Sequence, residues 1–95
     1  MENKKTESKK QASLLNFKKA RSHIGKIIKM IEKDAYCVDI MQQNLAVIGL
    51  LRSAHQKLME NHLNTCFIKA LDSRNTQKKE KMVQEILKVA SLFNR

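Results

Sequence analysis

The chain has 95 residues and a formal net charge of +10 at neutral pH, from 19 Lys and Arg against 9 Asp and Glu. This length allows one domain at most, and a domain so small is expected to gain stability from a metal or from oligomerisation. Proline is absent, aromatic residues are few, and strong helix formers dominate, so a β protein is disfavoured and an all-α fold is expected.

The excess of positive charge favours a polyanionic partner. Nucleic acid is the commonest such partner, an anionic membrane surface is the rival, and simple solubility is the third explanation. No segment is long and apolar enough to span a membrane, and the N-terminus lacks the apolar core of a signal peptide. We therefore expect a cytoplasmic protein without a membrane partner, with two free cysteines rather than a disulfide.

Residues 1–11 are polar and Lys-rich, which predicts a disordered basic tail ahead of one helical domain over residues 12–95. A first helix is predicted from about Ala12 to Lys33. Its apolar residues recur every three or four positions: Phe17, Ala20, Ile24, Ile27 and Ile31. Its cations fall largely on the remaining surface and suggest a DNA-binding face: Lys18, Lys19, Arg21 and Lys26, with Lys29 and Lys33 beyond. His23 lies among them and is expected to face solvent or a phosphate.

Asp34 is expected to cap a second helix, running from about Tyr36 to Ala70. Two stripes of mostly apolar residues follow its length at helical spacing. The first consists of Val38, Met41, Leu45, Ile48, Arg52, His55, Met59, His62 and Cys66. The second consists of Val47, Leu51, Ala54 and Leu58. So wide an apolar surface requires helices on more than one side. A helix from about Lys79 to Phe93 completes the subunit. A long central helix with short partners predicts oligomerisation by bundling.

His62 and Cys66 are four residues apart, which puts both side chains on one helix face, where they could bind a metal or simply pack in a core. Cys37 precedes His62 by 25 residues, or roughly 38 Å along a continuous helix. One subunit cannot join them, whereas two antiparallel copies can. Two thiolates and one imidazole form a soft, three-coordinate donor set that suits Cu(I) better than Zn(II). The alternative for Cys37 is a small buried residue.

The segment DAYCVDIMQQNLAV, followed by HLNTC, resembles the copper-sensitive operon repressors, the CsoR family, and the resemblance covers residues 17–93. It implies a three-helix subunit, an antiparallel dimer forming a four-helix bundle, and a dimer of dimers. It also implies that the apo form binds operator DNA and that the inducer releases it. Cys37, His62 and Cys66 match the copper ligands of that family.

The resemblance adds residues around that site. Tyr36 and Glu85 fall where copper sensors carry residues that surround the ligands, with Glu80 as a competitor for the second position. Arg52 matches a basic position used toward DNA. The first helix departs from the family, because KKARSHIGK replaces an R-x-x-R-x-E-G-Q-like stretch.

These features predict a Cu(I)-responsive transcriptional repressor that binds double-stranded operator DNA as a homodimer or homotetramer. Two alternatives stay open. One is a thiol-based persulfide or redox sensor of the same fold, and the other is a copper-buffering protein with no role at DNA. No nucleophile elbow or Gly-rich phosphate loop is present, so an enzyme is not expected.

Overall fold

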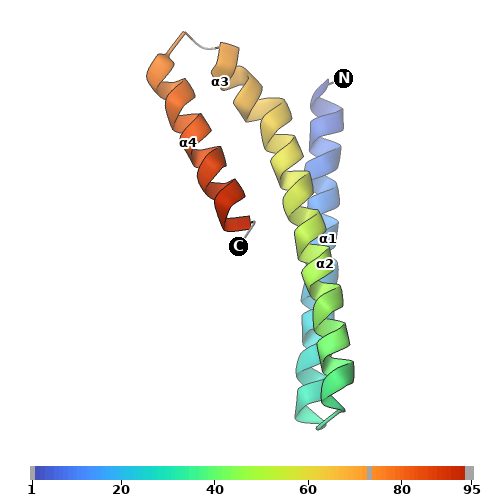
Figure 1. Ribbon diagram of the computed structural model, residues 1–95. Helices are drawn as coiled ribbons and strands as arrows, with labels where there is room; N and C mark the ends of the chain where they lie inside the picture. The colour runs from blue at the N-terminus through green and yellow to red at the C-terminus, as the bar shows by residue number, and fades with distance from the viewer. Residues whose placement is uncertain (1, 73, 94–95) are drawn as a thin grey trace. The chain divides into compact units, whose positions relative to one another are not determined.

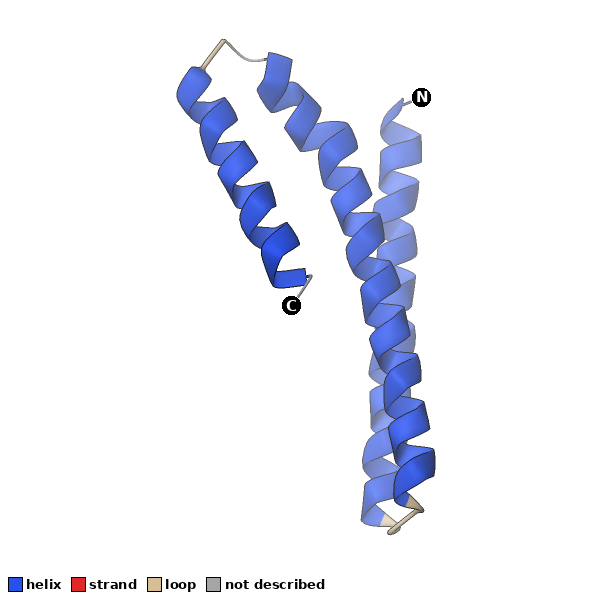
Figure 2. Ribbon diagram, viewed as in Figure 1, coloured by secondary structure: helices blue, strands red, loops and turns tan. Residues whose placement is uncertain are grey.

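The computed structural model describes the backbone of residues 2–72 and 74–93, and the side chains of residues 9–65, 68–69, 71–72 and 74–93. Its elements, in chain order, are α1 (Glu2–Glu32), α2 (Cys37–His62), the π-helical segment η1 (Leu63–Phe67), α3 (Ile68–Asp72) and α4 (Thr76–Phe93) (Figures 1 and 2). The expected all-α fold is confirmed for the described residues. The chain forms two compact units, Met1–Asn61 and His62–Arg95, which are described separately.

The turn between α1 and α2 is built around Asp34, which has a left-handed backbone with φ of 57°. The amide of Asp34 donates to the Ile31 carbonyl, and the amide of Ala35 donates to the Met30 carbonyl. This pair of bonds is the Schellman arrangement that ends a helix. The expectation that Asp34 caps the second helix is therefore wrong. Tyr36 takes the N-cap position before α2 instead, because its carbonyl accepts the amides of Asp39 and Ile40.

The first unit is a long antiparallel hairpin of α1 against α2 (Figure 1). We call its interhelical contact the hairpin seam. Its members recur every three or four residues along each helix: Ser13, Asn16, Ala20 and His23 on α1, and Gln43, Val47, Leu50, Ala54 and Lys57 on α2. Among the described side chains, the buried apolar ones are Ala20, Val47 and Ala54. Small residues let the two helices approach closely, but they bury little apolar area.

Polar contacts fix the register of the hairpin seam. Asn16 is 8% exposed, and its amide donates to the Leu50 carbonyl over 3.1 Å while its oxygen accepts from Lys57 over 3.2 Å. His23 Nε2 and Gln43 Oε1 are hydrogen-bonded at 2.7 Å. The expectation that His23 faces solvent or a phosphate is therefore wrong, since the ring is half-buried between the helices.

The apolar face expected for the first helix is only partly buried. Ala20 lies in the hairpin seam, but Phe17, Ile24 and Ile31 are exposed. The polar residues Ser13 and Asn16 take the buried positions instead. The helix was therefore predicted correctly, whereas the residues that it buries were predicted only in part.

Residues 2–11, expected as a basic tail, form the first turns of α1. Near this end Lys9 Nζ lies 3.1 Å from Glu60 Oε2, an ion pair between α1 and the last turn of α2. The division into tail and domain stays a prediction.

The second unit begins where the helix that contains α2 changes its hydrogen bonding. Helical backbone continues through η1 into α3, but the five residues of η1 are π-helical. The expectation of an unbroken α-helix to Ala70 is therefore wrong over Leu63–Phe67. After the connector, α4 folds back and contacts α3 (Figure 1).

Candidate metal centre and nucleic-acid interface

Cys37 is the first residue of α2 and carries a free, exposed thiol. It borders a surface hollow of about 410 Å³ whose other lining residues are Ile31, Asp34, Ala35, Ile40 and Met41. Most of this lining is apolar. A thiol in such surroundings is accessible to a soft metal or to an oxidant.

His62 is the last residue of α2 and is half-buried. Its Nε2 atom lies 3.2 Å from the Sδ atom of Met82, which α4 provides. Cys66 belongs to η1, and its side chain lies outside the described residues. Because the backbone from Leu63 to Phe67 is π-helical, the ideal α-helical spacing between His62 and Cys66 does not apply here.

α2 runs from Cys37 to His62 as one α-helix of 26 residues, and Gly49 does not interrupt it. The rise of about 1.5 Å per residue separates its ends by roughly 38 Å. A metal site shared by two antiparallel chains requires α2 to be continuous in this way. Among the described residues, no cluster of three or more His, Cys, Asp or Glu side chains could hold a metal within the subunit.

Two residues expected around the ligands occupy different settings. Tyr36 precedes α2, and its side chain is 69% exposed. Glu85 follows Met82 by three residues, so the helical repeat puts it on the side of α4 that carries Met82.

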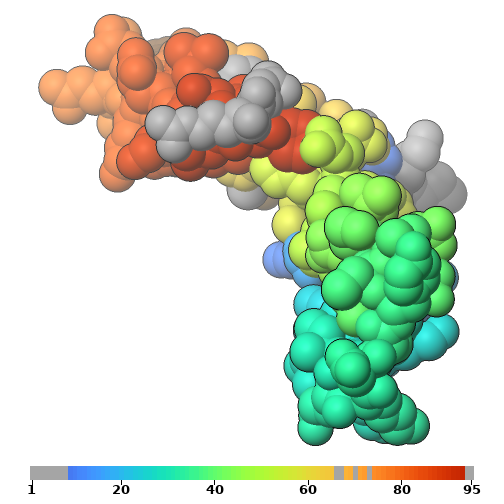
Figure 3. Space-filling view, turned by 60° about the horizontal axis from the view of Figure 1, so that its bottom comes forward, coloured from blue at the N-terminus to red at the C-terminus, as the bar shows by residue number. Residues whose placement is uncertain are grey.

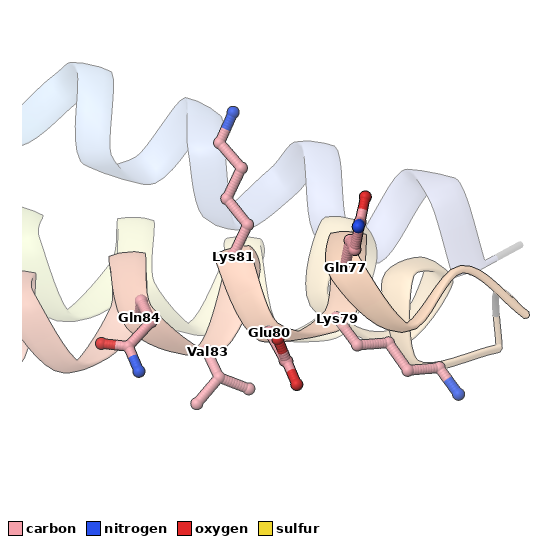
Figure 4. Close-up of a pocket in the computed structure, with 6 residues that line it drawn as sticks. All are labelled: Gln77, Lys79, Glu80, Lys81, Val83 and Gln84. Atoms are coloured by element: carbon pink, nitrogen blue, oxygen red, sulfur yellow. The ribbon is translucent and has the colours of Figure 1, made fainter.

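Glu80, the competitor, precedes Met82 by two residues and lies on the other side of α4. It lines a shallow surface hollow of about 500 Å³, whose other lining residues are Gln77, Lys79, Lys81, Val83 and Gln84 (Figure 4). Of the two acids, Glu85 is thus the one on the side of α4 that meets His62.

The cations of α1 lie away from the hairpin seam. Six cations along and just after the helix are exposed: Lys18, Lys19, Arg21, Lys26, Lys29 and Lys33. Lys18 lies directly opposite the seam by the helical repeat, whereas Arg52 lies on the side of α2 that faces away from α1. Within one hairpin the structure therefore separates Arg52 from Lys18.

Met82 is the residue that sequence analysis missed at the candidate metal centre. Met82 recurs with Ile86, Val89 and Phe93 at helical spacing, and a methionine in such an apolar pattern is usually a packing residue. One feature of the sequence could have indicated it: the methionine sulfur is a soft metal donor, and the chain already contained the soft donors Cys37 and Cys66.

Residues 9–91 match the family described as metal-sensitive transcriptional repressors. The match spans most of α1, all of α2 and most of α4. The chain belongs to this family.

Three proteins that are similar to this chain are named copper-sensing transcriptional repressors. A copper-sensing transcriptional repressor CsoR of Mycobacterium ulcerans is 43% identical over 79 residues, covering 82% of this chain and 68% of the relative. The CsoR protein of Mycobacterium bovis is 39% identical over 84 residues, covering 87% and 71%. The CsoR protein of Bacillus subtilis is 29% identical over 93 residues, covering 98% and 89%. In the part of the chain that the structure describes, no helix has the length and apolarity to cross a membrane.

Proposed function

We propose that this protein is a cytoplasmic copper(I)-responsive transcriptional repressor. The metal-free form binds double-stranded operator DNA, and Cu(I) held by Cys37, His62 and Cys66 releases it. One observation carries the proposal: an unbroken α2 has an accessible thiol at its first residue and an imidazole at its last, in a chain similar to copper-sensing repressors.

The donor chemistry fits Cu(I). Thiolate and imidazole are soft or intermediate ligands, and soft ligands at low coordination select Cu(I). When bound, the metal supplies a positive centre that ties two subunits together. The chain supplies Cys37 from one subunit, and His62 with Cys66 from the other.

The small core of the subunit supports oligomerisation. Large apolar side chains along the side of α2 that faces away from α1 are exposed, including Met41, Leu45 and Ile48. We call Met41, Leu45, Ile48 and Arg52 the open face of α2; the first half of α2 (green) lies on the surface in Figure 3. An antiparallel second copy would cover this face and bring each Cys37 to the partner's His62. A pair of such dimers would form the homotetramer.

The mechanism is thermodynamic linkage between two sites. Copper that prefers the DNA-free state lowers DNA affinity, and DNA must lower copper affinity by the same factor. DNA binding itself is expected to use the exposed cations of α1 together with Arg52, which a second hairpin would have to bring onto one surface. Replacing Lys18 or Arg21 by Ala should lower operator affinity and reduce the salt slope by about one unit per lost phosphate contact.

Mixing two defective variants tests the two-chain site. Homodimers of Cys37→Ala and homodimers of Cys66→Ala each lack an intact site. A mixed dimer regains one site, made of Cys37 from the Cys66→Ala chain and of His62 with Cys66 from the Cys37→Ala chain. Co-refolding should therefore restore up to one tightly bound Cu(I) per mixed dimer, measured by chelator competition. If the chains exchange and no tight binding returns, the two-chain site is wrong.

The exposed thiol of Cys37 favours a second candidate, a thiol-based persulfide sensor. In that case Cys37 and Cys66 become crosslinked between subunits, and His62 has no role. A His62→Ala variant separates the two functions. It should lose Cu(I) affinity in a copper sensor, whereas it should still form the crosslink with a persulfide donor in a thiol sensor, as mass spectrometry would show.

A further inference from the structure

Met82 lies against the imidazole of His62, although the proposed ligand set does not use it. The two residues belong to the same compact unit, and both side chains are half-buried. The contact joins His62 Nε2 to Met82 Sδ over 3.2 Å. The element α4 therefore presents a sulfur atom directly to the ring that α2 contributes to the candidate metal centre.

A thioether sulfur carries lone pairs and no proton. In the metal-free chain, the ring must therefore be the donor of the N–H···S contact. The same sulfur is also a soft metal ligand of the kind that selects Cu(I). Bonds of about 2.0 Å to nitrogen and about 2.3 Å to sulfur, as in zinc sites, can reach one ion when the two donors are 3.2 Å apart.

We propose that Met82 is a copper(I) donor, and that it forms with His62 a soft pair within one subunit. This inference rests on the proposed function, because it adds a ligand to the same site. When Cu(I) binds Nε2, the proton leaves that atom for solvent and Nδ1 takes up a proton, so the ring stays neutral. Within that site the pair supplies two donors from one subunit, Cys37 of the second subunit completes the site, and the soft donor set disfavours harder divalent ions.

The competing explanation is packing, because methionine fills irregular gaps between helices. Met82→Leu separates the two, since it keeps the side-chain volume and removes the sulfur. Met30→Leu is the matched control: Met30 is also half-buried, but it belongs to α1 in the other unit. Both variants should bind operator DNA in the metal-free form as the wild type does.

The experiment uses the full chain with isotope-labelled methionine methyl groups, titrated anaerobically with Cu(I) and, in parallel, with Ag(I) as a soft ion of equal charge. The Met82 methyl signal, identified by its absence from the Met82→Leu spectrum, should shift and saturate with the first equivalent. With Ag(I) it should also show coupling to the silver nucleus, which requires a bond. The Met30 signal should stay in place.

Affinity gives the second measurement. Loss of a residue that merely orients a ligand lowers metal affinity about 10–100-fold, and loss of a direct donor should lower it at least tenfold. In competition with a Cu(I) chelator, Met82→Leu should therefore bind at least about tenfold more weakly, and Met30→Leu should match the wild type.

The outcomes separate this inference from the proposed function. A wild type that binds Cu(I) tightly, with a Met82 methyl that neither shifts nor couples to silver, overturns the donor role and leaves the copper sensor standing. A weaker Met82→Leu without silver coupling in the wild type also overturns it, because Met82 then only positions His62. A wild type that binds no Cu(I) removes the proposed function and this inference together.

Discussion

The two sides of α2 are built from different kinds of residue. The side in the hairpin seam carries the small residues Val47 and Ala54, with polar contacts at Gln43 and Lys57. The open face carries large apolar side chains, and Leu45 is 65% exposed. The side that is packed within the subunit is therefore the less apolar one.

The two sides of α2 therefore have different roles. Small side chains and hydrogen bonds fix the register of α1 against α2, but they bury too little apolar area to stabilise a domain strongly. Large exposed apolar residues gain free energy only when something covers them. We infer that folding of the subunit and assembly of the oligomer are closely coupled. Substitutions at four positions test this inference.

The largest effect is expected at the open face. Ile48→Glu should prevent dimer formation at micromolar concentration, because an unpaired charge buried in an interface costs about 3–5 kcal/mol. Light scattering measures the mass of the assembly, and Cu(I) affinity should fall with it. Ala46→Glu is the control, since Ala46 is exposed and lies off the open face. An Ile48→Glu protein with the wild-type mass would show that the open face is not an interface.

The hairpin seam should respond to excess volume. Ala54 is 0% exposed between the helices, so Ala54→Leu forces them apart and should lower the free energy of unfolding by about 1–3 kcal/mol. Urea denaturation measures this. Ala46→Leu, at an exposed position of the same helix, should change stability much less. Equal stability of the two variants would mean that α1 and α2 do not approach closely at Ala54.

Loss of the polar contact in the same seam should have a smaller effect. Asn16→Ala removes the bonds to the Leu50 carbonyl and to Lys57, which should lower the free energy of unfolding by about 1–2 kcal/mol. The control Asn44→Ala, at an exposed position of α2, should stay within about 0.5 kcal/mol of the wild type. If both variants unfold at the same urea concentration, Asn16 does not fix the register.

The smallest effect concerns the turn that separates the two helices. Asp34 has φ of 57°, a conformation that costs L-residues free energy and glycine almost none. Asp34→Gly should therefore raise the free energy of unfolding by about 0.5 kcal/mol, and Asp34→Val should lower it by about 1 kcal/mol. Thermal unfolding checks both signs. A stabilising valine would contradict the left-handed turn.

The sequence alone determined the helical class, the approximate helix positions and the basic surface of α1. It also placed Cys37 and His62 near the two ends of one long helix. These features depend on local properties, namely residue propensity and a repeat of three to four residues, which hold in any tertiary environment. The N-cap of α2 was less well determined, because Asp34 and Tyr36 are close enough in sequence for either to take that position.

Only the tertiary structure decided which stripe of α2 meets α1, and that Met82 meets His62. Both stripes of α2 have the same helical repeat, so apolarity by itself favoured neither. Which stripe meets α1 depends on how closely the two backbones can approach at Ala20 and Ala54. It also depends on the hydrogen bond from Asn16 to the Leu50 carbonyl, 34 residues away. Contacts of this range depend on how whole helices fit together, which a local pattern does not encode.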